Sequence, residues 1–423
     1  MDLTQFSTLD IPVEYNFGLH NNLLSEMSTP RLSPPEVFHK EVTPSAGITN
    51  QKSSGRCWMF SGLNMLRRGI MEDNNFPSSF EFSQSYLFFW DKLERMNYLI
   101  VLLTMFKEKG LTLEDRQVNF IMKDPFGDGG QWSMFENLVN KYGVVPKSVY
   151  GESKHSSNSR GVNMVLCQMF RDYVARLYGN RKVDFGEHMK KTYLTLVRFF
   201  GKPPSDFVFE YKKGKEIVNK KFSPLEFKEF CKIDMSRYVS VVHDPRNDFH
   251  KLYSIENLNN MEGGKSVKYM NMCMSRFKEL TKSALDKNHP VWFGSDVGQF
   301  FLSKYSLLDE NAFNYKRYLD IDIEMNKKER IETGESIPGH AMVYTGYHLD
   351  RFGKVDYWKI ENSWGKTGPY DGYLVCSDKW FEDYTFQIVL PIDILNEEEK
   401  RVWSGNEFEK THPIWDPLGT LAS

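Results

Sequence analysis

The sequence contains 423 residues, carries a formal net charge of −2 and is 15% aromatic. A chain of this length can bury a large core, and such an aromatic content is typical of a packed protein, not of a disordered one. The near-neutral charge gives no general attraction to nucleic acid or to acidic membranes. The most apolar stretch, residues 98–106, is too short to cross a bilayer.

The N-terminus and the cysteines indicate a reducing compartment. The first residues lack a basic segment followed by an apolar run, so no secretory signal is expected. Five cysteines are scattered without a CxxC pair, at Cys57, Cys167, Cys231, Cys273 and Cys376. Neither a disulfide framework nor a metal site is predicted, and no cofactor is expected. We therefore expect a cytoplasmic protein that does not associate with membranes.

The first part of the chain is predicted to be helical. Residues 1–45 are rich in proline and look like an arm with short helical pieces. The next segment, 46–135, is expected to form a helical lobe. Within it residues 57–71 are apolar with a helical period, which places Cys57 near a helix N-terminus. A second core helix is predicted from Phe82 onward.

The character of the sequence changes after Pro290. Residues 136–285 carry helical patterns broken by prolines and are predicted to form a helical insertion. From 286 to 405, short runs of strand-forming residues alternate with Gly and Asp-Gly turns. Residues 406–423 follow as a C-terminal arm. The predicted fold class is α+β, with a helical lobe, a strand-rich, barrel-like lobe and a cleft between them.

Four residues carry the chemistry of nucleophilic acyl transfer. Cys57 would be the nucleophile, and a thiol needs an imidazole partner or a helix N-terminus to become a thiolate at neutral pH. His340, which begins a predicted strand, would be that partner, and the carbonyl of the Asn362 side chain could orient its ring. The Gln51 amide, with the backbone N–H of Cys57, could donate to the oxyanion. We expect Cys57 and His340 to form a thiolate–imidazolium pair.

Several other features of the sequence admit a structural or a functional interpretation. The remaining cysteines are predicted to be small buried hydrophobes. The lysine-rich segment 212–221 is predicted to be a solvated face in preference to a nucleic-acid patch. The glycine-rich turn 127–130 is not followed by a Gly-Lys-Ser/Thr string, so a phosphate loop is a weak alternative. The indole of Trp364 could shield the His340–Asn362 hydrogen bond from water.

The chain resembles the bleomycin hydrolase family of papain-like cysteine aminopeptidases. The resemblance extends from about Thr43 to the last residue. The Cys–His separation of 340 − 57 = 283 residues and Arg56 before the nucleophile differ from secreted papain relatives and are typical of this branch. The matching strings are Thr49–Trp58, Glu81–Lys92, Asp128–Trp132, Val291–Gly298, Gly339–Met342, Glu361–Gly365 and Pro413–Gly419.

The resemblance implies a thiol protease that removes N-terminal residues from peptides and hydrolyses the bleomycin amide. It assigns Cys57, His340, Asn362 and Gln51 to catalysis. It also implies a homohexamer, with subunit contacts made by the 136–285 insertion. The C-terminal arm, 406–423, would enter the cleft of its own subunit, and its carboxylate would hold the substrate's amino group.

Four residues are accordingly predicted to bind substrate: Asp296, Trp364, Ala422 and Ser423. Ser423 is also a candidate for removal by the enzyme itself. Leu418 and Thr420 depart from the family's commoner tail pattern. The competing interpretation is a hexameric ring that binds nucleic acid weakly and has secondary peptidase activity. Another Cys–His acyltransferase is disfavoured because Asn, not Asp, is the predicted orienting residue.

Overall fold

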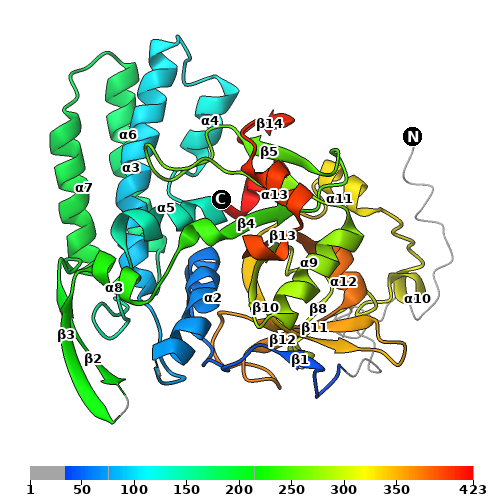
Figure 1. The fold of residues 1–423 in the computed structure, drawn as a ribbon. Coiled ribbons are helices and arrows are strands. Elements are labelled where there is room, and N and C mark those ends of the chain that lie inside the picture. The colour runs from blue at the N-terminus through cyan, green and yellow to red at the C-terminus, as the bar shows by residue number, and fades with distance from the viewer. Residues whose placement is uncertain (1–33, 75, 214, 423) are drawn as a thin grey trace, which may run out of the picture.

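The computed structural model describes residues 34–422 except 75 and 214. The predicted N-terminal arm therefore lies, up to residue 33, outside the described residues. Figure 1 shows two lobes side by side, one helical and one built around a large sheet. No helix within the described ranges combines the length and apolar character needed to span a bilayer.

The helical lobe is centred on α3, which is the second core helix predicted from Phe82 onward. Ser83 caps this helix by accepting a hydrogen bond from the amide of Tyr86, and α6 and α7 pack against it (Figure 1). The helices of this lobe are α2 (Cys57–Asn74), α3 (Gln84–Glu108), α4 (Arg116–Lys123), α5 (Trp132–Tyr142), α6 (Arg160–Tyr178), α7 (Phe185–Phe200) and α8 (Pro224–Phe230). A two-stranded hairpin, β2 (Phe207–Lys213) and β3 (Glu216–Phe222), extends from it.

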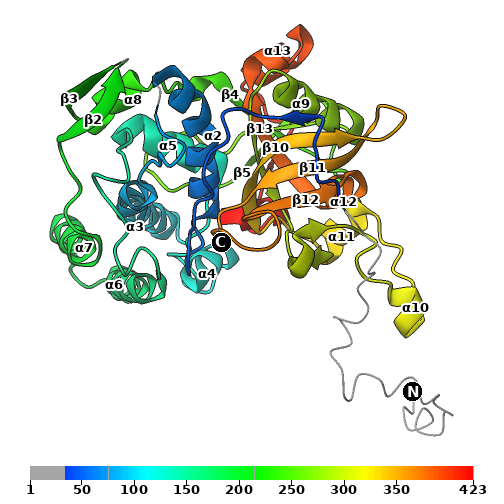
Figure 2. The same cartoon turned by 90° about the horizontal axis from the view of Figure 1, so that it is seen from below.

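The second lobe contains a sheet ordered β14-β5-β6-β4-β13-β7-β10-β11-β12-β9-β8, with β1 added to β10. Its strands are β1 (Lys40–Glu41), β4 (Tyr238–Val242), β5 (Lys251–Ile255), β6 (Tyr269–Asn271), β7 (Val291–Ser295), β8 (Phe301–Leu302), β9 (Leu307–Leu308), β10 (His340–Leu349), β11 (Val355–Glu361), β12 (Tyr373–Ser377), β13 (Thr385–Pro391) and β14 (Lys410–His412). Helices α9 (Met274–Asp286), α10 (Tyr315–Leu319), α11 (Lys327–Thr333), α12 (Asp378–Tyr384) and α13 (Glu397–Ser404) surround it (Figure 2). Short 3₁₀ turns lie at η3 (Met235–Arg237), η4 (Ser303–Tyr305), η5 (Ile392–Ile394) and η6 (Pro417–Ala422).

Strand β10 is buried on both faces, which explains its almost continuous apolar sequence. Ala341 and Val343 belong to the core that includes α2, whereas Met342 and Tyr344 belong to the core beneath α9 and α12. A hydrogen bond also joins α2 to β10. Ser61 Oγ donates to the carbonyl of Ala341 over 2.8 Å. The lobe carrying the predicted nucleophile is thus fixed against the strand carrying the predicted base.

The prediction that 136–285 is a helical insertion is wrong for its second half. Residues 207–213 and 216–222 form the β2–β3 hairpin, and β4, β5 and β6 join the large sheet. Apart from β1, the strands of the sheet lobe therefore begin near residue 238, before the predicted boundary at 286. The predicted strands in 286–405 are confirmed as β7, β10, β11, β12 and β13.

Candidate active site

Helix α2 begins at Cys57, as predicted from the sequence. The loop before it is anchored by Asp128, whose carboxylate accepts a 3.0 Å hydrogen bond from the amide of Gly55. Arg56 is fully buried and forms a bidentate pair with Glu152 at 3.1 and 3.0 Å. These contacts fix the backbone that presents the thiol at the helix N-terminus, where the helix dipole favours negative charge.

His340 and Asn362 meet because β10 and β11 are neighbouring strands. His340 is the first residue of β10, and Asn362 directly follows the last residue of β11. The two side chains are hydrogen-bonded, with 2.9 Å between His340 Nε2 and Asn362 Oδ1. The Trp364 ring lies against the imidazole, with 4.8 Å between ring centroids. The amide therefore orients the imidazole, and the indole covers it.

The Gln51 side chain is held from two sides. Its Nε2 donates to the carbonyl of Ser54 over 2.7 Å, and its Oε1 accepts from Ser363 Oγ over 2.6 Å. One N–H of the amide remains after the bond to Ser54. Ser363 also donates its backbone N–H to Asn362 Oδ1 over 2.8 Å. Ser363 thus joins the oxyanion candidate to the residue that orients the imidazole.

Burial dominates the electrostatics of the Cys57–His340 pair. Burial raises the pKa of the Cys57 thiol to about 11, although the backbone amides of Ala341, Trp58 and Cys57 itself act in the opposite direction. Burial likewise lowers the pKa of His340 to about 4, although the hydrogen bond that the imidazole donates to Asn362 Oδ1 acts in the opposite direction. Both shifts favour an uncharged thiol and imidazole. Burial thus opposes the expected thiolate–imidazolium pair, which stays a prediction.

The contribution of the Ala341 amide to the thiol pKa places Cys57 beside the start of β10. The structure thus brings together the four residues predicted from the sequence. Cys57 is only 4% exposed and His340 only 7%. A site so closed needs either a displaced cover or a narrow entry for substrate.

The C-terminal tail lies beside the start of β10. Thr420 Oγ1 donates over 2.8 Å to the carbonyl of Pro338, two residues before His340. Leu421 is buried in the same apolar core as Cys57 and packs against Gly294, where an added Cβ would lie 3.2 Å from Leu421 Cδ2. Ala422 is partly exposed and borders a pocket of about 350 Å³ between the tail, α4 and α5. Ser423 lies outside the described residues.

Asp296 lies near His340, but no hydrogen bond joins the two side chains. It follows β7, whose Ser295 is paired with His340 in the sheet. Its carboxylate accepts from Ser336 Oγ over 3.0 Å, and burial raises its pKa above the usual range. The position is at the edge of the site, and its predicted role in substrate binding stays a prediction.

Two residues that support the site were not singled out from the sequence. Asp128 holds Gly55 with its side chain, and its carbonyl accepts a 2.7 Å hydrogen bond from the indole of Trp58. The Asp-Gly-Gly-Gln-Trp string was a signal for Asp128, but the residues that Asp128 contacts are distant from it in sequence. Ser363 lies within the matching string Glu361–Gly365, but no role was predicted for it. A hydroxyl residue directly after an orienting Asn was the available signal.

The fold and the site define a papain-like cysteine peptidase. Residues 13–419 match the model of the Peptidase C1-like family, and the chain belongs to that family. Aminopeptidase C of Lactococcus lactis subsp. lactis is 40% identical over 389 residues, covering 89% of this chain and 87% of that protein. The mitochondrial cysteine proteinase 1 of Saccharomyces cerevisiae is 38% identical over 406 residues, covering 91% and 83%.

A solved structure shows the same architecture. PepW from Lactobacillus rhamnosis superposes with a TM-score of 0.84 at 34% identity, over 94% of this chain and 90% of that one. The predicted α+β, papain-like fold and the resemblance to this group of peptidases are thereby confirmed. This chain is a cysteine-type peptidase whose relatives include the aminopeptidases C of Lactococcus lactis and Streptococcus thermophilus.

Proposed function

We propose that this protein releases N-terminal residues from peptides, with the C-terminal tail closing the non-primed side of the site. The observation that supports this proposal is the contact of Thr420 with Pro338, which carries the tail to within two residues of His340. Leu421 continues the tail into the core beside Gly294. A cleft filled in this way leaves room for the start of a peptide and not for its middle.

The tail would also select substrates with a free amino group. A substrate's α-ammonium in a buried site requires an anion, because a buried charge without its partner costs about 3–5 kcal/mol. We propose that the carboxylate of Ser423 supplies that anion. A substrate with an acetylated N-terminus lacks the ammonium and leaves the carboxylate unpaired, so it should be rejected.

The reaction would proceed by acyl transfer. Cys57 Sγ attacks the carbonyl carbon as His340 accepts the thiol proton, and the oxyanion receives hydrogen bonds from Gln51 and the Cys57 amide. The proton then passes to the leaving amine, which departs and leaves a thioester. Water, deprotonated by His340, hydrolyses the thioester and regenerates the thiol. The same steps would cleave a primary amide such as that of bleomycin.

The test compares an aminoacyl-coumarin amide with its N-acetylated counterpart. Wild-type protein should hydrolyse the free amine at least about a hundredfold faster, the factor that 3 kcal/mol implies. Cys57→Ala should hydrolyse neither compound while keeping the circular dichroism of the wild type. Equal hydrolysis of both compounds, or wild-type turnover by Cys57→Ala, would refute the proposal.

We also propose that the protein assembles as a homohexamer in the cytoplasm. The β2–β3 hairpin supports an assembly role because Val208 and Ile217 on it are 63% and 66% exposed. Replacing both with glutamate should give a smaller particle in sedimentation velocity. The five cysteines are all free, which suits a reducing compartment. Thiol titration of denatured, unreduced protein should therefore find five thiols.

A second candidate function is weak binding of nucleic acid. Lys212, Lys220 and Lys221 are exposed on the same hairpin. Filter binding of single-stranded DNA over a salt series tests it, because phosphate contacts give an affinity that falls with salt. Salt-dependent binding retained by Cys57→Ala, together with no peptidase turnover by wild type, would favour this candidate over the peptidase.

A further inference from the structure

His340 is reached through a short turn that precedes the regular part of its strand. Helix α11 ends at Thr333 and β10 begins at His340, so residues 334–339 connect the two elements. Glycines stand at both ends of this turn, and Gly334 has a φ of 76°. Glycine has more backbone freedom than any other residue. The position of the predicted base therefore depends on the contacts that hold the 334–339 turn.

The Asp296 carboxylate holds the middle of this turn. Ser336 Oγ donates to Asp296 Oδ2 over 3.0 Å, and Ser336 is fully buried. The backbone amide of Ile337 also hydrogen-bonds to the carboxylate and acts to lower its pKa, although burial outweighs this effect. The carboxylate thus accepts hydrogen bonds from the side chain of one turn residue and from the backbone of the next.

The backbone of Asp296 is fixed to the centre of the sheet. Asp296 directly follows Ser295, the residue of β7 that is paired with His340. The amide of Gly339 donates to the carbonyl of Ser295 over 3.0 Å, and the amide of Asp296 donates to the carbonyl of Tyr384 over 3.1 Å. Strand β7 lies between β10 and β13. The carboxylate is therefore attached to the strand against which His340 is registered.

The acceptor sites of Asp296 are already used within the protein. An ionised carboxylate offers about four lone-pair sites. The Ser336 hydroxyl, the Gln299 side chain and the amides of Ile337 and Gly298 all hydrogen-bond to this carboxyl group. A carboxylate that binds substrate needs free acceptor sites. This geometry favours a role toward the turn over direct contact with substrate.

We propose that Asp296 is a positioning residue for His340. Its carboxylate fixes the 334–339 turn, and the turn sets the distance between the His340 imidazole and the Cys57 thiol. A displacement of about 1 Å at a reacting group can lower a rate about a hundredfold. The inference rests on His340 as the base, which belongs to the proposed function, and it assigns Asp296 an action through His340 and not on the substrate.

Asp296→Asn tests the role with an aminoacyl-coumarin amide as substrate. The amide nitrogen replaces an acceptor oxygen with a donor, so at least one donor of the turn loses its partner. We expect kcat to fall roughly 10- to 100-fold while KM stays nearly unchanged. A raised KM with unchanged kcat would indicate substrate binding and would overturn the proposal.

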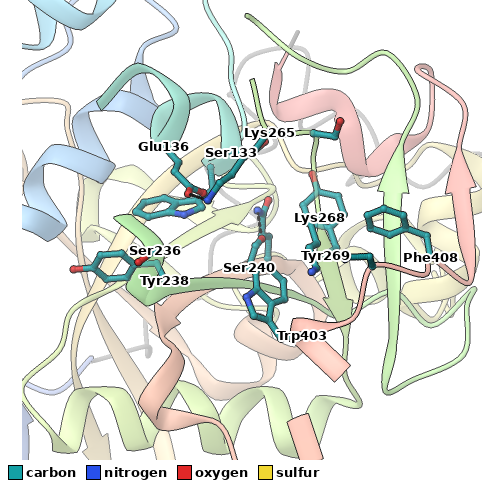
Figure 3. A pocket seen from close by; sticks show the side chains of 14 residues that line it. Ser133, Glu136, Ser236, Tyr238, Ser240, Lys265, Lys268, Tyr269, Trp403 and Phe408 are labelled. Atoms are coloured by element: carbon teal, nitrogen blue, oxygen red, sulfur yellow. Dashed lines mark hydrogen bonds and ion pairs between the residues drawn. The ribbon is translucent and has the colours of Figure 1, made fainter. Parts of the chain in front are cut away.

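Ser336→Ala is the milder companion variant. It removes one donor and leaves the Asp296 carboxylate in place, so it should lower kcat by a smaller factor than Asp296→Asn. Glu136→Gln is the control, because it makes a carboxylate-to-amide change at a pocket that none of the four catalytic candidates lines (Figure 3). Its kcat should equal that of wild type. Unchanged kcat in both Ser336→Ala and Asp296→Asn, with circular dichroism like that of wild type, would overturn the proposal.

Alkylation of Cys57 separates positioning of His340 from a general loss of structure. The imidazole accepts the thiol proton, and the thiolate is the form that iodoacetamide attacks. Asp296→Asn should slow alkylation, followed by mass spectrometry of the Cys57 peptide, at least about threefold, the factor that half a pKa unit of the thiol gives. In a His340→Ala background the same change should have no further effect.

The outcomes distinguish failure of this inference from failure of the proposed function. An equal slowing by Asp296→Asn with and without His340 would show that Asp296 does not act through the imidazole, and would overturn the inference alone. Wild-type alkylation and turnover in His340→Ala would refute His340 as the base, and would overturn the inference together with that part of the proposed function.

Discussion

The side-chain amide of Gln131 donates a 3.2 Å hydrogen bond to the main-chain carbonyl of Leu418. Three residues earlier, Asp128 holds Gly55 of the nucleophile loop, and Trp58 donates its indole N–H to the Asp128 carbonyl. Between them, Gly130 packs so closely on the Trp58 ring that an added Cβ would lie 2.4 Å from it. One short loop thus contacts both the nucleophile segment and the tail.

Replacing Gln131 should loosen the tail. Gln131→Met removes the donor to Leu418 at nearly constant volume, and a lost hydrogen bond costs about 0.5–1.5 kcal/mol. The undocked fraction of the tail should therefore rise roughly two- to tenfold. We expect cleavage of N-acetylated peptides to rise by a similar factor. Gln117→Met on α4 is the control, and an unchanged ratio of acetylated to free-amine cleavage in Gln131→Met would contradict the expectation.

Asp128 should stabilise the protein only above acidic pH. Burial raises its pKa, but Lys92, Ser159 and Asn163 outweigh burial and hold the pKa well below the usual range. A carboxyl whose pKa is depressed by folding contributes stability above its unfolded pKa of about 3.9, and this contribution is lost as the pH falls below it.

Asp128→Asn tests this pH dependence. At pH 7 the variant leaves Lys92 buried without its partner, and its free energy of unfolding should fall by about 3–5 kcal/mol. The difference from wild type should shrink as the pH falls below about 4, because the carboxyl then protonates in the unfolded state while it stays ionised in the folded state. Urea unfolding at pH 7, 5, 4 and 3 measures it. A difference that stays constant across this series would show that the charge of Asp128 is not the cause.

Removing residues 418–423 should expose the catalytic pair. Burial is the main cause of the raised pKa of Cys57 and of the lowered pKa of His340, and the tail contributes Leu421 to that burial. With water admitted, the thiol pKa should fall, and each unit gives a tenfold larger thiolate fraction at pH 7. We expect iodoacetamide to alkylate Cys57 at least about tenfold faster.

The same truncation should convert the enzyme toward cleavage within peptides, measured on N-acetylated substrates. Leu421→Ala is a milder companion variant, which keeps the backbone of the tail and should give an intermediate alkylation rate. An alkylation rate and a free-amine preference equal to those of full-length protein would show that the tail does not cover the site.

Gln51 and Ser363 should act together on the oxyanion. Gln51→Ala should lower kcat by roughly 10²–10³, the usual effect of losing one oxyanion donor. Ser363→Ala removes the 2.6 Å hydrogen bond that fixes the Gln51 amide, so it should lower kcat by less and leave KM nearly unchanged. In Gln51→Ala background the Ser363 change should have little further effect. Additive losses in the double variant would contradict this coupling.

The sequence was informative where signals were local. The apolar run at 57–71 predicted α2, and the buried runs predicted β7, β10 and β13. Strands β4, β5 and β6 were missed because they lie among charged residues, in a segment with a mainly helical sequence pattern. Their pairing depends on contacts distant in sequence, such as Val239 with Leu390, which no local pattern records.

The candidate site likewise has a part that local sequence motifs predict and a part that depends on contacts distant in sequence. Cys57, His340, Asn362 and Gln51 each lie in a short sequence motif, and the neighbouring residues in that motif suit the predicted role. The anchoring carboxylate of Asp128 depends on Gly55 and Ser159, whose proximity only the fold creates. The pKa shifts of the catalytic pair depend on burial beneath the lobes and the tail, and residue types alone could not predict that burial.

The contacts of the nucleophile loop with the segment that precedes α6 have a consequence for protein engineering. The amide of Ser53 donates to the carbonyl of Ser157 over 3.0 Å, and Arg56 is paired with Glu152. A catalytic loop grafted from a papain relative that lacks this segment would therefore leave the partly buried Glu152 carboxylate without its arginine and the Ser157 carbonyl without its donor. Active chimaeras should require that residues 50–57 and 152–159 be exchanged as one unit.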